Sequence, residues 1–368
     1  KIHTYAQDGR LFEGKTPVSA FLNSSYDGSF IAGLMELRYI QSLPVERIIN
    51  YFESHGFTLK KPTAHKLMEK ASSLFENLYK CIRQTALSDP YKAADETYYK
   101  ILVPEKNSKG KGVRKGYLWV VVGINTRMIY LLYDDGSRSE KVILNELGGC
   151  KGIIQSDGYS PYRKLESDAY PHITRIPCLQ HIKRKFIDCG EDEPDAKRIV
   201  ELINTLYQNE HKHKIGVDGW TVEQNLVHRK KYAPDILGEI KDVLDDIEER
   251  GDLLPKSELK EAVTYLRNEW NAVVDIFNYG DTYLDNNIVE RMNRYISLSR
   301  KNSLFFGSHK GAERGAILYT IALTCRMNKV NLFEYLTDVI NRTAEWQPNT
   351  PLEKYRQLLP DRWEKAND

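Results

Sequence analysis

The chain has 368 residues, of which 41% are hydrophobic and 28% charged, with a formal net charge of +2. This balance excludes a disordered or low-complexity chain, and the length allows two or three domains. No apolar run is long enough to span a bilayer and no signal-peptide pattern opens the sequence. We therefore expect a soluble cytoplasmic protein without a membrane partner. The five cysteines are widely spaced and odd in number, which argues against a disulfide framework.

Charge is unevenly distributed along the chain. Residues 291–314 contain six basic side chains and one acidic one, whereas residues 235–261 contain ten acidic and four basic side chains. Such a separation can present a basic face to a polyanion. Two ordinary solvated helix faces are the alternative interpretation.

The N-terminal quarter is expected to be an arm followed by helices. Residues 1–27 lack periodicity and predict an irregular arm. Apolar residues at helical spacing then predict a first helix from about residue 30 to 40. A second helix is predicted at 45–54 and a third from about residue 62, running on toward residue 88. Residues 28–90 are thus predicted to form a helix-turn-helix region that binds DNA, or a helical packing unit without DNA contacts. Its candidate recognition residues are Lys60, Lys61, Thr63, His65 and Lys66.

Residues 91–189 switch to a pattern of strands and short helices. The predicted strands are 94–103, 117–124, 128–133, 152–156 and 173–177. The predicted helices are 139–147, with Ser137 as its cap, a helix from about 160, and 179–187. Three meandering strands followed by alternating units predict an α/β fold with a ribonuclease-H-like core.

The rest of the chain is predicted to be helical. Residues 190–280 read as a helical insertion. Residues 281–330 read as the second part of the core, with a helix at 285–299 capped by Asp285-Asn286-Asn287 and another at 312–327. Residues 331–368 form a C-terminal tail with a helix at 332–343.

Three acidic residues are the candidate catalytic groups. Asp95 lies on the first predicted strand, where alternation turns Glu96 to the other face. Asp157 ends an apolar strand beside a glycine, and Glu290 shares a helix face with Arg294. Taken singly, these residues are also explained by a solvent-facing strand edge, an ordinary Asp-Gly turn and an exposed ion pair.

The combination of the three carboxylates points to metal-dependent chemistry. Two aspartates on neighbouring strands and a glutamate on a later helix can hold two Mg²⁺ or Mn²⁺ ions, which prefer carboxylate oxygens. Such a pair of ions activates the attacking and leaving oxygens of a phosphoryl transfer. The pattern predicts an enzyme that acts on a phosphodiester.

Several long motifs carry a resemblance to a known family. They are ADETYY, IIQSDGYSPYRKL, CLQHIKRKF, LDNNIVERMNRYISLSRKNSLFFGSHKGAERGAILYTI and LLPDRW. They resemble the insertion sequence 66 family of bacterial transposases over nearly the whole chain. The resemblance implies a DDE-type transposase with a ribonuclease-H-like core, its triad falling on Asp95, Asp157 and Glu290, and a helical insertion before the last of these. Family members commonly carry an N-terminal zinc-binding cluster and a coiled coil. This chain shows neither and begins at Lys1, so we expect a missing upstream segment.

The resemblance also implies partners and further site residues. The expected partners are terminal inverted repeats and target DNA, a second copy in a homodimer or higher oligomer, and accessory proteins of the element. The enzyme would then associate with the nucleoid. Basic residues expected to contact DNA phosphates are Lys183, Arg184, Lys185, Arg291, Arg294, Arg300 and Lys301. Core burial is expected for Phe305 and Phe306.

Cys178 and His181 form a C-x-x-H pair that is similar to a pattern found in several DDE transposase groups. Three residues apart, they share one helix face. Two ligands are too few for a structural zinc site, so a packing role or a place near the DNA is favoured over zinc.

We therefore predict a DNA transposase that cleaves the ends of an insertion sequence and transfers the strands. Two alternatives remain open. One is a ribonuclease-H-like nuclease or resolvase that cuts without joining. The other is a non-catalytic, transposase-derived DNA-binding protein.

Overall fold

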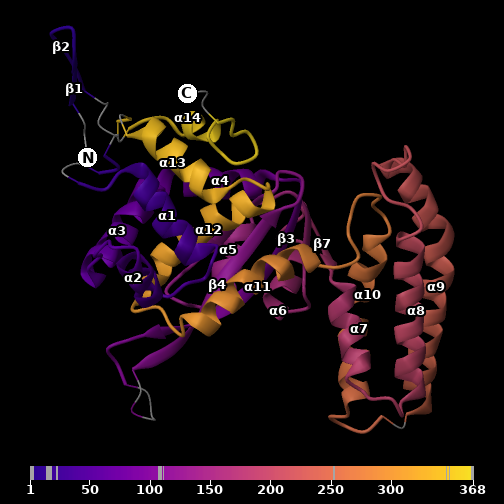
Figure 1. Ribbon diagram of the computed structural model, residues 1–368. Coiled ribbons are helices and arrows are strands. Elements are labelled where there is room, and N and C mark those ends of the chain that lie inside the picture. The colour runs from indigo at the N-terminus through magenta and orange to yellow at the C-terminus, as the bar shows by residue number, and fades with distance from the viewer. Residues whose placement is uncertain are drawn as a thin grey trace.

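The computed structural model describes residues 4–13, 19–21, 24–106, 110, 112–251, 253–344, 346–347 and 349–365. A five-stranded mixed sheet lies among helices from both ends of the chain, and a bundle of long helices projects to one side (Figure 1). Within the described residues, no helix has the length and apolar character needed to cross a membrane.

The sheet has the order β5-β4-β3-β6-β7. Its strands are β3 (Tyr91–Leu102), β4 (Val113–Gly123), β5 (Met128–Leu132), β6 (Gly152–Ser156) and β7 (Ile173–Pro177). The first three are antiparallel neighbours, and β6 and β7 run parallel to β3. All five predicted strands are confirmed, the last two with the same bounds. β4 lies between β5 and β3, and its segment 118–122 is buried on both faces, which explains its continuous apolar run.

Short helices connect the strands of this sheet or follow its last strand. They are α5 (Glu140–Leu147), α6 (Ser160–Arg163), the 3₁₀ helix η1 (Lys164–Glu166) and α7 (Leu179–Ile187). The predicted cap of α5 is wrong by two residues. Ser139 is the N-cap and its hydroxyl accepts from the Lys141 N–H at 3.3 Å, whereas Ser137 accepts from the Ser139 N–H and stabilises the preceding turn.

The N-terminal arm contains a β-hairpin, which corrects the prediction of an irregular segment. Strands β1 (Thr4–Gln7) and β2 (Arg10–Glu13) pair in an antiparallel register. Asp8 and Gly9 between them have φ values of 50° and 74°, as a tight two-residue hairpin turn requires. The parts of the predicted arm at 1–3, 14–18 and 22–23 lie outside the described residues.

The helices of the two chain ends share one hydrophobic core with the sheet. The N-terminal ones are α1 (Gly28–Tyr39), α2 (Val45–Ser54), α3 (Lys61–Leu74) and α4 (Glu76–Ser88). The C-terminal ones are α11 (Asn287–Asn302), α12 (His309–Met327), α13 (Leu332–Thr343) and α14 (Leu352–Arg356). The predicted third helix does not run unbroken to residue 88, because Phe75 leaves helical geometry between α3 and α4. Helix α1 packs on α13 and α3 packs on α12, so both chain ends build this core together.

Residues 194–276 form three long helices, which we call the helical arm. They are α8 (Pro194–Glu210), α9 (Val222–Arg250) and α10 (Glu258–Ile276). Together with α7, they enclose a second hydrophobic core that continues onto β6 and β7. The arm therefore leaves the sheet after α7 and returns along β7 to the start of α11 (Figure 1).

Candidate active site

The register of the sheet places two of the predicted carboxylates at the same level. Ala93 of β3 is paired with Gln155 of β6, and this is the last parallel pair between the two strands. Asp95 and Asp157 each follow that pair by two positions. Because side chains alternate along a strand, Asp95 is directed as Ala93 is, and Asp157, one residue beyond the end of β6, is close enough for its charge to raise the pKa of Asp95.

Asp95 is held by helix α11. The Asn293 side-chain amide donates to Oδ2 of Asp95 at 2.6 Å, and the Glu96 N–H donates to Oδ1 at 2.8 Å. Burial and the charges of Glu96 and Asp157 raise the pKa of Asp95 to about 8 despite these donors. A bound cation would stabilise the charged form of a carboxyl group in this environment.

Glu96 is an additional acidic residue at the site. Its carboxylate is bound on the other side of β3, by Arg138 in an ion pair and by the Tyr162 hydroxyl at 3.3 Å. It nevertheless borders the same cavity as Asp95, and burial and the charge of Asp157 raise its pKa. The site therefore gathers three carboxylates from β3 and the end of β6.

The loop that carries Asp157 is braced by the helical arm. Oδ1 of Asp157 accepts from the Tyr159 N–H at 3.1 Å. The Gly158 N–H donates to the Tyr265 hydroxyl of α10 at 2.8 Å, and Arg175 of β7 donates to the Asp157 carbonyl at 3.1 Å. Arg175 is fully buried and ion-paired with Glu269 of α10. No sequence pattern predicts these supporting residues, because they act only through the tertiary contact of α10 with β7.

Glu290 lies in the first turn of α11, beside β3. Of the predicted capping run, Asp285 accepts from the Asn287 N–H at 3.1 Å, whereas Asn286, the residue before the helix, makes no capping bond with its side chain. Its amide instead donates to the Ala94 carbonyl of β3 at 2.9 Å. Glu290 and Asp95 then border one cavity of about 270 Å³. The cavity is completed by Glu96, Thr97, Asn293, Arg294 and Ser297.

The polar atoms around this cavity fit a bound cation. Oε1 of Glu290 and Oδ1 of Asn293 are both buried and have no hydrogen-bond partner in the described chain. Unpaired buried acceptors beside an acidic cluster are ready to bind a hard cation. Oε1 of Glu290 lies 3.7 Å from Nδ1 of His181, so this carboxylate faces α7 as well as the cavity.

Comparison with known proteins decides the family. The profile of the Transposase IS66 family matches residues 23–314. The chain belongs to this family.

Three proteins of Sinorhizobium fredii resemble this IS66-family chain, each named as an uncharacterized protein. The identity to y4jD is 25%, covering 90% of this chain and 65% of y4jD. The identity to y4hP is 25%, with 88% of this chain and 60% of y4hP covered, and the identity to y4qI is 29%, with 71% and 49% covered. This chain thus spans about half to two thirds of the length of these relatives.

The predicted basic residues of the IS66-family chain lie on two helices near the cavity. On α11, Arg291, Arg294 and Lys301 are exposed. Arg300 is instead committed to β3, where it stacks on the Tyr98 ring and donates to the Tyr98 carbonyl. On α7, Arg184 and Lys185 are exposed and Lys183 is half-buried. Exposed basic side chains therefore lie on α11, which carries Glu290, and on α7, which faces Glu290 through His181.

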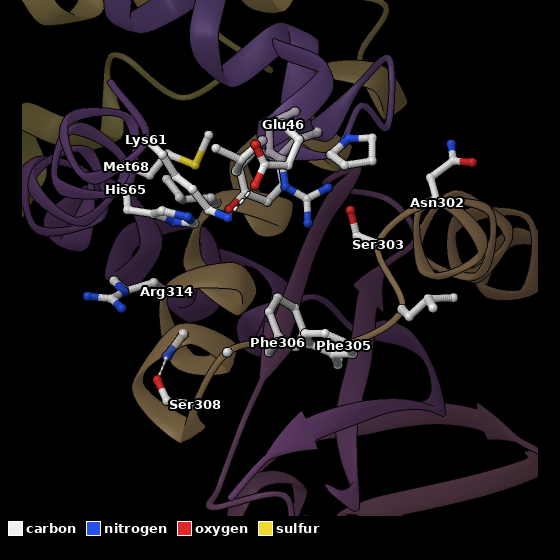
Figure 2. Close-up of a pocket in the computed structure, with 18 residues that line it drawn as sticks. Glu46, Lys61, His65, Met68, Asn302, Ser303, Phe305, Phe306, Ser308 and Arg314 are labelled. Carbon is white, nitrogen blue, oxygen red and sulfur yellow. Dashed lines mark hydrogen bonds and ion pairs between the residues drawn. The ribbon is translucent and has the colours of Figure 1, made fainter. Parts of the chain in front are cut away.

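Of the predicted recognition residues, Lys61 and His65 border a second cavity, of about 540 Å³, between α2, α3 and the segment after α11 (Figure 2). Lys61 lies at its edge in an ion pair with Glu46, while Lys60 and Lys66 are exposed and Thr63 is half-buried. The burial prediction is confirmed for Phe306, which packs on Tyr99, and wrong for Phe305, whose side chain lies at the cavity and is 47% exposed.

Proposed function

We propose that this protein is the DDE-type transposase of an insertion sequence, which cleaves the element ends and joins them to target DNA. The observation that carries the proposal is the placement of Asp95 and Asp157 at one level of two neighbouring strands, with Glu290 bordering the same cavity as Asp95. The strand order β5-β4-β3-β6-β7 supports a ribonuclease-H-like core, because it places three antiparallel strands beside two parallel ones. The helical arm would then be the insertion before the last carboxylate.

Asp95, Asp157 and Glu290 are the residues that would hold two Mg²⁺ or Mn²⁺ ions. When bound, such ions supply Lewis-acid activation of the attacking and leaving oxygens of a phosphodiester. Asn293 fixes the rotamer of Asp95 through its hydrogen bond, and Tyr265 and Arg175 fix the loop of Asp157. The protein thereby positions its carboxylates before substrate arrives, which lowers the cost of organising the reaction.

DNA would reach the site along exposed basic side chains of α7 and α11. Arg184, Lys185, Arg291 and Arg294 lie on the two helices that carry His181 and Glu290, and each can neutralise a phosphate. Helices α2 and α3 would contact the terminal inverted repeats in the manner of a helix-turn-helix. A homodimer or larger assembly in the bacterial cytoplasm would bring two ends together, with or without accessory proteins.

A strand-transfer assay tests the proposal. Purified protein, Mg²⁺, a DNA fragment carrying one element end and a supercoiled target plasmid are expected to yield joined products. Asp95→Asn, Asp157→Asn and Glu290→Gln should each reduce joining by several orders of magnitude, because each removes a metal ligand while preserving side-chain volume. Asp168→Asn is the matched control, since Asp168 is an exposed turn residue and joining should be unchanged.

The alternatives give different products. Cleaved but unjoined ends would favour the nuclease or resolvase. End binding with no cleavage, unaltered by Asp95→Asn, would favour the non-catalytic DNA-binding protein. Joining that survives loss of any one of the three carboxylates contradicts the proposed chemistry.

A further inference from the structure

Three side chains of mixed metal-binding type meet where α7 and α11 begin. Cys178 is the residue before α7, His181 lies in its first turn, and Glu290 lies in the first turn of α11. One ligand atom from each lies within 4.8 Å of the other two. In the part of the chain that the structure describes, no other group of three or more Cys, His, Asp or Glu residues meets this closely.

Two hydrogen bonds hold the two helix starts against each other. The Asn286 N–H donates to Sγ of Cys178 at 3.2 Å, and the Leu179 N–H donates to the Leu284 carbonyl at 2.9 Å. The bond between Leu179 and Leu284 joins the two helix starts through backbone atoms alone, whereas the bond from Asn286 uses the thiol of the cluster itself. Helix starts that are joined by a backbone hydrogen bond provide a suitable frame for ligands.

The two polar members of the cluster lack ordinary partners. Nδ1 of His181 and Oε1 of Glu290 are both buried, and neither has a hydrogen-bond partner in the described chain. They lie 3.7 Å apart, which is too far for a hydrogen bond. A tetrahedral zinc ion with bonds of about 2.0–2.2 Å would hold a nitrogen and an oxygen about 3.4 Å apart. The His181–Glu290 pair would need to close by about 0.3 Å, and Sγ of Cys178, which lies within 4.8 Å of a ligand atom of each, would have to sit roughly 3.6 Å from both for a Zn–S bond of about 2.3 Å.

We propose that Cys178, His181 and Glu290 bind a transition metal ion of the Zn²⁺ class. A thiolate and an imidazole select such an ion, whereas Mg²⁺ prefers an all-oxygen environment such as Asp95 and Asp157 provide. Three protein ligands leave the fourth tetrahedral position open to water or another ligand. The site shares Glu290 with the proposed catalytic site, whereas its other two ligands, Cys178 and His181, take no part in the proposed transposition chemistry.

Cobalt titration of the metal-free full-length chain tests this site. One equivalent of Co²⁺ is expected to bind, with a thiolate-to-Co²⁺ charge-transfer band and the visible bands of tetrahedral coordination, and Zn²⁺ should displace it. Cys178→Ser should abolish the charge-transfer band, and His181→Gln should weaken the affinity for Co²⁺ by roughly 10–100-fold or more. Cys189→Ser is the matched control, because Cys189 is a half-buried thiol outside the cluster, and the band should persist.

The outcomes separate this site from the proposed catalytic one. Asp95→Asn should leave Co²⁺ binding unchanged, although it should abolish strand transfer. Absence of the charge-transfer band in the unaltered protein, or its persistence in Cys178→Ser, overturns the proposal. If circular dichroism finds that Cys178→Ser is unfolded, His181→Gln decides, because the His181 side chain is 26% exposed and its loss should leave the fold intact.

Discussion

Substituting Gly158 by alanine should displace the loop of Asp157. A Cβ at this position would lie 2.5 Å from the Tyr265 hydroxyl oxygen and 2.6 Å and 2.7 Å from two ring carbons. Ordinary contact begins at 3.4 Å, so the loop and the ring must separate by about 0.9 Å. Tyr265 cannot easily retreat, because its ring packs against the second hydrophobic core.

The expected effect has two components. Overpacking costs about 1–3 kcal/mol of folding free energy, to which the weakened hydrogen bond between Gly158 and Tyr265 adds about 1 kcal/mol. A catalytic group displaced by about 1 Å loses on the order of 100-fold in rate. Strand transfer should therefore fall much further than the folded fraction of the protein does.

The assay pairs urea unfolding with the strand-transfer reaction on the same preparations. Gly149→Ala is the control, because a Cβ there meets no atom within 4 Å and the residue lies in the turn before β6. A second substitution, Tyr265→Ala, should restore part of the activity of Gly158→Ala by removing the clashing ring. Wild-type rate and stability in Gly158→Ala would refute the inference that α10 positions Asp157.

Three further predictions concern neighbouring groups. The pKa of Asp95 is about 8 in the folded protein against an ordinary 3.8, so between these pH values the folded metal-free protein binds a proton that the unfolded chain has lost. The free energy of unfolding should therefore fall as pH rises from about 4 to about 8. Asp95→Asn should remove that fall in denaturant titrations at acidic pH and above pH 8, and an unchanged pH profile would argue against a buried, repelled carboxyl. Glu269→Gln should destabilise the fold by about 3 kcal/mol, because it leaves the buried Arg175 with the more exposed Glu166 alone; urea unfolding measures this, and an effect no larger than that of Glu166→Gln would contradict it. Asn293→Ala should weaken Mg²⁺ binding by roughly 10-fold, because Asp95 loses the donor that orients it; calorimetry compares it with Ser297→Ala, which should bind Mg²⁺ normally.

The sequence predicted those elements whose signals are local. The apolar runs of β4, β6 and β7 and the apolar periodicity of α13 sufficed to place them, because burial on defined faces dictates these patterns. The Asp8-Gly9 turn was an equally local signal for the β1–β2 hairpin, and its strands were missed because they are short and fully or partly exposed.

The candidate site was predictable only in part. Asp95, Asp157 and Glu290 could be selected from motif and chain position, but their relative placement depends on the parallel register of β3 with β6 and on how α11 crosses β3. Neither is encoded in a short window. The exposure of Phe305 could not be inferred either, because it follows from the cavity between α3 and the segment after α11.

The helical arm lies in the sequence between the second and third carboxylates, and its contacts help to position both of them. It leaves the sheet directly after α7 and returns directly before α11, and Leu284, next to α11, accepts the backbone bond from Leu179 at the start of α7. The same arm contributes Tyr265 and Glu269, which hold the loop of Asp157 directly and through Arg175. The helical arm therefore returns the chain to the helix that carries Glu290 and also supports the loop of Asp157. Because both effects depend on the docking of α10 against β7, loosening that interface should disturb two carboxylates that lie far apart in sequence, while Asp95, held by β3 and Asn293, keeps its place.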